Sequence, residues 1–168
     1  IKFAWSNWGF GQEDLHTSLN RLIEAGVEYV ELHGNRYGDS LGYEASKVRR
    51  ALNDFGMEVS GICGMFTPKN DLSSSEGWIR QEAIDYLKRN IELGHELDAE
   101  YFLIAPAAVG RPEPIDEFEF DRSLETLGKV ADELEAAGLK GAIEPIRAAE
   151  TSIVHTFADA ERYIEKMD

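Results

Sequence analysis

Apolar residues in this chain alternate between two spacings, and that alternation constrains the fold more than any other feature. Short apolar runs typical of strands are each followed by a longer segment whose apolar residues recur every three or four positions, as on one face of a helix. Gly26, Gly56 and Gly138 end three of these helices, and a strand-like run begins within two residues. The pattern predicts strands over 2–8, 27–33, 57–62, 100–105 and 139–144, and helices over 12–25, 42–55, 78–97, 118–137 and 157–167.

Repeated strand–helix–strand units predict an α/β fold with a parallel sheet. The connections after the second, third and fourth strands are long, at 34–41, 64–77 and 107–117, which indicates a site at the carboxyl ends of the strands. Two architectures fit. A doubly wound sheet of five strands would be complete in 168 residues, whereas a (β/α)₈ barrel typically needs about 250. The periodicity alone does not choose between them.

The composition excludes several kinds of partner and site. A net charge of −15 and a pI near 4.6 would repel polyanions, so no nucleic-acid partner is expected. No apolar run approaches about 18 residues, so no membrane span is expected. The lone Cys63 excludes an internal disulfide and a multi-cysteine zinc site, and it fits a reducing compartment. We therefore expect residues 1–168 to form one domain of an acidic, cytoplasmic enzyme, with a salt-adapted protein as the alternative.

Glu144 is the residue that the pattern singles out for chemistry. The apolar run 141–143 ends in this carboxylate, and Pro145 then stops regular strand pairing. A carboxylate at the end of a buried strand is costly to desolvate, but a divalent metal or a proton transfer would require it there. The alternative is structural, with Glu144 paired to a nearby arginine such as Arg147. The residues alone leave both interpretations open.

Three further residues are candidates for a site. Glu150 follows Glu144 by six positions and lies in the loop after the fifth strand. His33 ends the second strand, and the two-residue alternation puts it on the same face as Glu31, although a solvated strand end fits equally well. Trp8, at the end of the first strand, is suited to form an apolar wall against the C–H face of a sugar.

Other residues predict structure rather than chemistry. Cys63 has no histidine near it in sequence and is expected to pack rather than to act as a nucleophile. Trp5 is expected in the core. The run DLSSSE at 71–76 predicts a serine capping box that opens the third helix. His155 is expected at or beside the N-cap of the last helix.

Three segments resemble the xylose isomerase-like TIM-barrel superfamily, in its sugar isomerase and epimerase branch, and within it the ketose 3-epimerases of tagatose and psicose type. VEYVELH resembles the family's second strand, and DLSSSEGWIRQEAIDYLKRNIELGHELDAEYFLIAP resembles its third helix and fourth strand. In EPIRAAETSIVHT the two family glutamates correspond to Glu144 and Glu150. Arg147-Ala148-Ala149 departs from the family's Asn-Arg-aromatic, and His155-Thr156 replaces its Asn-Thr.

The resemblance implies a (β/α)₈ TIM barrel, of which this chain supplies about the first five units. It implies that Glu144 is a metal ligand and one of two acid/base carboxylates, and that Glu150 binds substrate hydroxyls. The other ligands would come from strands six to eight, which are expected beyond Asp168 because strand five would otherwise be an open edge. The implied cofactor is a divalent metal ion, Mn²⁺ first, with Co²⁺, Mg²⁺ or Zn²⁺ as alternatives.

The implied reaction is a metal-dependent isomerisation or epimerisation of a ketose, or of a related small polyol or keto sugar. The metal would polarise the carbonyl, one glutamate would remove the adjacent proton to give a cis-enediolate, and the opposite carboxylate would return a proton. His33 and Trp8 are expected to help bind the sugar, and the assembly is expected, by analogy, to be a homodimer or homotetramer. A non-catalytic sugar-binding barrel is the alternative. An endonuclease IV-like repair enzyme is disfavoured because strands three and four end without histidine and the charge is −15.

Overall fold

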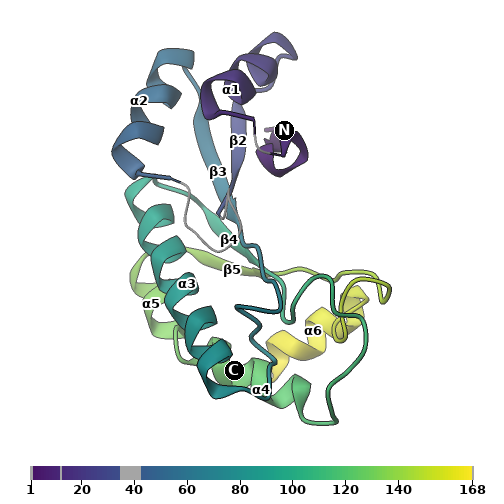
Figure 1. Cartoon of the computed structure of the whole chain (residues 1–168). Helices are drawn as coiled ribbons and strands as arrows, with labels where there is room; N and C mark the ends of the chain where they lie inside the picture. Colours follow the sequence, from purple (N-terminus) through teal and green to yellow (C-terminus); the bar gives the residue numbers. More distant parts are fainter. Residues whose placement is uncertain (1, 12, 35–42, 168) are drawn as a thin grey trace.

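The computed structural model describes residues 2–11, 13–34 and 43–167 and shows a five-stranded parallel sheet with helices between the strands (Figure 1). Gln12 and 35–42 lie outside the described residues, and with them the expected first residues of two helices and most of the first long connection. In chain order the elements are β1 Ala4–Ser6, the 3₁₀ helix η1 Asn7–Phe10, α1 Leu15–Glu24, β2 Tyr29–His33, α2 Ala45–Phe55, β3 Glu58–Cys63, α3 Gly77–Glu96, β4 Tyr101–Ile104, α4 Glu119–Gly128, α5 Ala131–Ala136, β5 Lys140–Ile143 and α6 Phe157–Glu165.

The spatial order of the strands separates the two architectures that the sequence left open. A doubly wound sheet reverses its strand order at a switch point, where the helices change faces. Here β1 to β5 are neighbours in chain order, and every pair is parallel. Right-handed crossovers in one direction put the helices on one face of the sheet, and α2, α3 and α5 lie along the same side of it in Figure 1. This is the arrangement of the first five units of a (β/α)₈ barrel, as predicted.

The two faces of the sheet have different surroundings. On the face toward the helices, alternate residues are completely buried, and these are Val30, Leu32, Ile62, Phe102 and Ile104. On the other, inner face, the side chains are only partly covered, as at Glu31, His33, Cys63 and Leu103. The two-residue period of a strand therefore assigns one set to the core and the other to a potential site.

Helix ends follow the local chemistry of the sequence. Asp14 caps α1 by accepting a hydrogen bond from the Thr17 backbone N–H at 3.0 Å. Thr156 and Asp159 form a capping box at the start of α6, which places His155 directly beside the N-cap, as predicted. Gly26 and Gly138, which were expected to end helices, have φ angles of 75° and 74°, the left-handed conformation in which helices commonly stop. Within the described ranges, no helix is both long and apolar enough to cross a membrane.

The predicted residue ranges of two elements were wrong. The first strand ends at Ser6, because the chain then tightens into η1, so Trp8 lies on a 3₁₀ turn rather than at a strand end. The single helix expected over 118–137 is two helices. At the break, Lys129 and Val130 donate to carbonyls only three residues back, after Gly128 has weakened the helix.

Two expected structural roles were also wrong. The serine capping box does not form, because α3 begins after Glu76 with no side-chain cap. Instead, Asp71 accepts hydrogen bonds from the backbone N–H and hydroxyl of Ser73 at 2.9 and 2.8 Å. Trp5 is 55% exposed rather than buried, since β1 is three residues long and lies at the edge of the described sheet.

Gly61 allows a side chain to cross β3 on the inner face. A Cβ atom at this position would lie 2.4 Å from the ring of Tyr101, which is its partner on β4. The ring passes over Gly61, and its hydroxyl donates a hydrogen bond to Glu31 Oε2 on β2 at 2.7 Å. The missing side chain on β3 thus permits a direct link between β2 and β4.

We expect Gly61→Ala to destabilise the protein by about 1–3 kcal/mol, because the added methyl must displace the ring of Tyr101. Gly77→Ala is the matched control, since a Cβ atom added there would meet no described atom within 4 Å, and it should be neutral or slightly stabilising in α3. Urea denaturation measures both. Equal free energies of unfolding for the two variants would contradict the crossing.

Candidate functional site

A cavity of about 290 Å³ lies on the inner face at the carboxyl ends of the strands. This is the edge at which parallel α/β folds place their sites. The cavity brings together three of the predicted residues, Trp8, Glu144 and Glu150. Each strand, or the loop that follows it, contributes to the wall, through residues such as Ser6, Glu31, Cys63, Leu103 and Glu144.

The pairing of β5 with β4 points Glu144 into this cavity. Ile143 pairs with Ile104, whose side chain is buried on the helix side of the sheet. The Glu144 backbone N–H then donates to the Ile104 carbonyl at 2.9 Å, so the ladder continues for one more residue. Alternation therefore turns the Glu144 carboxylate to the inner face, and Pro145, which has no N–H, ends the ladder.

The carboxylate of Glu144 has no hydrogen bond or salt bridge with the described residues. Arg147, the partner named for the structural alternative, instead binds Glu150 at 2.7 Å, so the expected Glu144–Arg147 pair is wrong. Burial raises the pKa of Glu144, and the nearby charges of Glu31 and Glu150 raise it further. A half-buried carboxylate with no cationic partner among the described residues is suited to take a proton or to bind a metal.

Glu150 lies in the loop after β5 and is held from two sides. The Arg147 guanidinium lowers the pKa of its carboxyl through their hydrogen bond, and its backbone carbonyl accepts from the Gly110 N–H at 2.7 Å. The same loop contains Val154 at a φ of 58°, which is rare for a β-branched residue. The Val154 carbonyl accepts from the Ile146 N–H at 3.1 Å, which closes the loop. Backbone strain of this kind is often found beside functional sites.

His33 is not part of the cavity wall, although it shares the inner face with Glu31 as predicted. Its backbone N–H donates to Asn7 Oδ1 at 2.7 Å. Both of its ring nitrogens are buried and have no hydrogen-bond partner in the described part of the chain. Burial lowers the pKa of His33 to about 4, so the imidazole is neutral at physiological pH.

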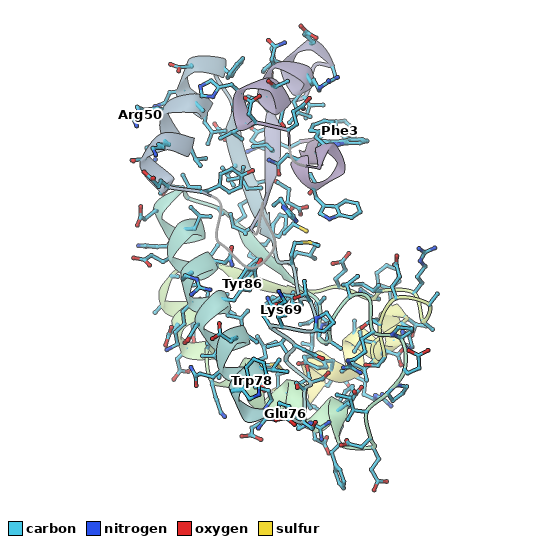
Figure 2. The ribbon with its side chains drawn as sticks, viewed as in Figure 1. Phe3, Arg50, Lys69, Glu76, Trp78 and Tyr86 are labelled. Atoms are coloured by element: carbon cyan, nitrogen blue, oxygen red, sulfur yellow. The ribbon has the colours of Figure 1, made fainter. Side chains whose placement is uncertain are left out.

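Backbone hydrogen bonds join the loops that surround the cavity. The Val109 N–H, after β4, donates to the Phe66 carbonyl, after β3, at 2.8 Å, and Gly110 reaches the loop after β5 through Glu150. Tyr86 on α3 fixes the start of the loop after β3, because its hydroxyl accepts from the Met65 N–H at 2.9 Å. In Figure 2, Tyr86 and Lys69 lie where α3 meets this loop. The three loops therefore form one connected wall.

A buried ion network strengthens that wall, and sequence reasoning missed it. Arg111, in the loop after β4, binds Asp71 at 2.7 Å and Glu119 at 2.6 Å. It also donates to the Ser73 hydroxyl at 2.8 Å. Both carboxylate side chains are only 2% exposed. The sequence contains little sign of this network. Arg111 lies between Gly110 and Pro112 in a loop, and its partners Asp71 and Ser73 are about 40 positions away, in the segment predicted to form a capping box.

Glu31 and Cys63 also line the cavity. Alternation in VEYVELH already placed Glu31 on the face of His33, whereas sequence reasoning missed Cys63 as a cavity residue. The thiol of Cys63 has its pKa raised to about 12 by burial and by the charges of Glu31 and Glu144. It therefore stays protonated, which agrees with the predicted packing role.

The cavity alone does not complete a metal centre. Among the described residues, no group of three His, Cys, Asp or Glu side chains is close enough to hold an ion. Glu144 fits the role of one ligand, since its carboxylate lines the cavity and has no partner in the described ranges. A complete coordination sphere would need ligands from outside these residues.

Comparison with known proteins identifies relatives of this arrangement. The family model described as xylose isomerase-like TIM barrel matches residues 19–168. A ketose 3-epimerase of Arthrobacter globiformis is 25% identical over 161 residues, which cover 95% of this chain and 54% of the relative. An L-ribulose 3-epimerase of Mesorhizobium japonicum is 25% identical over 165 residues, which cover 97% of this chain and 54% of the relative. The chain thus spans about half the length of the curated relatives it matches.

A solved structure shows the same fold. The D-allulose 3-epimerase of Methylomonas sp., crystallised with D-allulose, superposes with a TM-score of 0.86 and 13% identity. The match covers 99% of this chain and 59% of that chain. At this identity the likeness establishes the fold alone.

We expect Arg111→Gln to destabilise the protein by about 3 kcal/mol, because two buried carboxylates would lose their cation. Arg147→Gln is the matched control, since its pair with Glu150 has a similar length but its side chain is 74% exposed, and it should change stability by less than about 1 kcal/mol. Denaturant unfolding compares the two. Similar losses would mean that the Arg111 network does not depend on burial.

We expect His33 to make stability fall in mild acid. The fold favours the neutral imidazole, so the unfolded chain binds the extra proton as the pH drops from the ordinary pKa of 6.5 toward about 4. Between pH 7 and pH 5 the wild type should lose about 1 kcal/mol more than His33→Gln, a modest value because the residue is only partly buried. Unfolding at pH 8, where histidine is neutral in both states, supplies the baseline. Parallel pH profiles would contradict the prediction.

Proposed function

Because the chain belongs to the xylose isomerase-like TIM barrel family, we propose that it is the N-terminal part of a metal-dependent sugar isomerase or epimerase that acts on a ketose. The observation that carries the proposal is Glu144, a half-buried carboxylate in the cavity with no partner among the described residues and a raised pKa. The names of the relatives, a ketose 3-epimerase and an L-ribulose 3-epimerase, support a ketose as the substrate.

In this proposal Glu144 exchanges a proton with the carbon next to the ketose carbonyl. The C–H bond breaks, its electron pair moves toward the carbonyl oxygen, and Glu144 holds the proton. Return of a proton to the opposite face of the same carbon inverts it, and return to the neighbouring carbon isomerises the sugar. The position of Glu144 in the cavity, with no hydrogen-bond partner for its carboxylate among the described residues, supports this role. The second carboxylate is proposed to lie outside the described residues.

A divalent ion, Mn²⁺ first among the candidates, would supply charge stabilisation at the carbonyl oxygen when bound. Glu144 is the residue here that would hold it. Glu150 is proposed to bind sugar hydroxyls from a loop that Arg147 and Gly110 keep in place. Trp8, which is 57% exposed and lines the cavity, is proposed to cover the C–H face of the sugar.

His33 is proposed to contribute to this binding from the inner face of the sheet, because its ring nitrogens have no hydrogen-bond partner among the described residues and can hydrogen-bond a ligand. The proposed barrel would comprise this chain and further units that close the sheet. A homodimer or homotetramer stays a prediction.

The test is Glu144→Gln in the complete gene product, with exchange of the C3 proton of a ketose into D₂O followed by NMR. We expect the exchange rate to fall by at least about 10³-fold with an unchanged fold, because the amide cannot act as a base. Bound metal, measured by mass spectrometry of the purified protein, should fall in parallel. Glu100→Gln, a similar substitution at an exposed residue just before β4 and outside the cavity, should leave both unchanged.

Two results would overturn the proposal. Full exchange by Glu144→Gln would remove this carboxylate from the chemistry. Sugar binding by the wild type without any exchange or metal would instead establish a non-catalytic binding barrel.

A further inference from the structure

We propose that Glu31 is a further substrate-binding residue, which accepts a hydrogen bond from a sugar hydroxyl distant from the reacting carbon, and that Tyr101 is the positioning residue that holds it. This inference rests on the proposed function and names a second point of contact for the sugar. The two residues lie on β2 and β4, and both are on the inner face of the sheet.

The link between Tyr101 and Glu31 is built into the sheet. The Tyr101 hydroxyl donates to Glu31 Oε2 at 2.7 Å, and the ring reaches β2 because Gly61 leaves room above β3. The pKa of Tyr101 is raised to about 12, first by burial and then by this hydrogen bond, so the hydroxyl remains a donor. The Glu31 carboxylate is therefore held in one orientation.

That orientation leaves Glu31 with unused acceptor capacity in the cavity. A carboxylate has about four acceptor positions, and Tyr101 occupies one of them. No other hydrogen bond to this carboxylate occurs among the described residues, and Glu31 lines the same cavity as Glu144. A sugar hydroxyl is a neutral donor, so it can satisfy this acceptor without bringing another negative charge into the cavity.

The placement of the two carboxylates assigns them different parts of the ligand. Glu144 follows β5, Glu31 is on β2, and β3 and β4 run between them. Cys63, which also lines the cavity, is on β3 and so lies between β2 and β5 in the sheet. A ligand that offers its reacting carbon to Glu144 therefore extends its remaining hydroxyl-bearing carbons toward Glu31.

The experiment compares D-allulose with its 4-, 5- and 6-deoxy analogues in the complete gene product. Replacing both partners, as Glu31→Leu with Tyr101→Phe, avoids leaving either group buried and unpaired. We expect this double variant to lower kcat/KM for D-allulose by about 10- to 100-fold, mainly through KM. For the one analogue that lacks the contacted hydroxyl, variant and wild type should differ by less than about 2-fold.

Two further variants separate binding from structure. Tyr101→Phe alone keeps the carboxylate, so it should retain the preference for D-allulose over that deoxy analogue, although with a higher KM. Glu58→Gln, an exposed substitution on β3 outside the cavity, should behave as wild type. Calorimetric titration with D-allulose supplies a readout that does not depend on turnover, and the double variant should bind about 10- to 100-fold more weakly.

The outcomes distinguish this inference from the proposed function. If the wild type exchanges the C3 proton of D-allulose but the double variant loses the same factor with every analogue, Glu31 has only a structural role and the inference is wrong. If the wild type neither exchanges the C3 proton nor releases heat with D-allulose or with any other ketose offered, the proposed function fails, and the inference fails with it.

Discussion

Parallel pairing of the strands in chain order is the constraint on which the rest of this structure depends. It brings the carboxyl ends of five strands to one edge, so that residues far apart in sequence, such as Trp8 and Glu144, line one cavity. Because every strand alternates, one face can be fully apolar while the other carries polar groups. A shift of one residue in the pairing of β5 would bury Glu144 against the helices and turn Ile143 into the cavity.

The cavity wall also depends on a glycine in the middle of the sheet. Because Gly61 has no side chain, the ring of Tyr101 fills the space above it, and the Tyr101 hydroxyl reaches Glu31. A larger residue at 61 would block that bond even if the strands paired normally. On the inner face, the hydrogen bond from Tyr101 holds Glu31 in place. The loops beyond the strand ends are held instead by the buried ion pairs of Arg111. These are separate supports, because they join different elements.

Much of the fold was predictable, and the part that failed did so for physical reasons. Periodicity and glycine helix ends located the strands and helices, because burial of one face is a property of local sequence. The choice of a barrel came with the resemblance and with the observed strand order, since periodicity does not encode which strands are neighbours. Glu144 could be predicted from its position before Pro145. The partner of Arg147 could not, because two carboxylates at similar spacing compete for it, and the Asp71–Arg111 pair could not, because its members are separated by 40 positions.

The charges around the cavity indicate which ligands the described part of the chain prefers. Arg111 forms salt bridges with Asp71 and Glu119, and Arg147 forms one with Glu150. Glu31 has a neutral hydroxyl as its partner, and Glu144 has none among the described residues. No cation among the described residues offsets the charges of these two carboxylates in the partly desolvated cavity. A bound cation would reduce the repulsion between them, a neutral ligand would leave it unchanged, and an anionic ligand would add to it. On this wall of the cavity, electrostatics therefore disfavours a ligand that brings further negative charge.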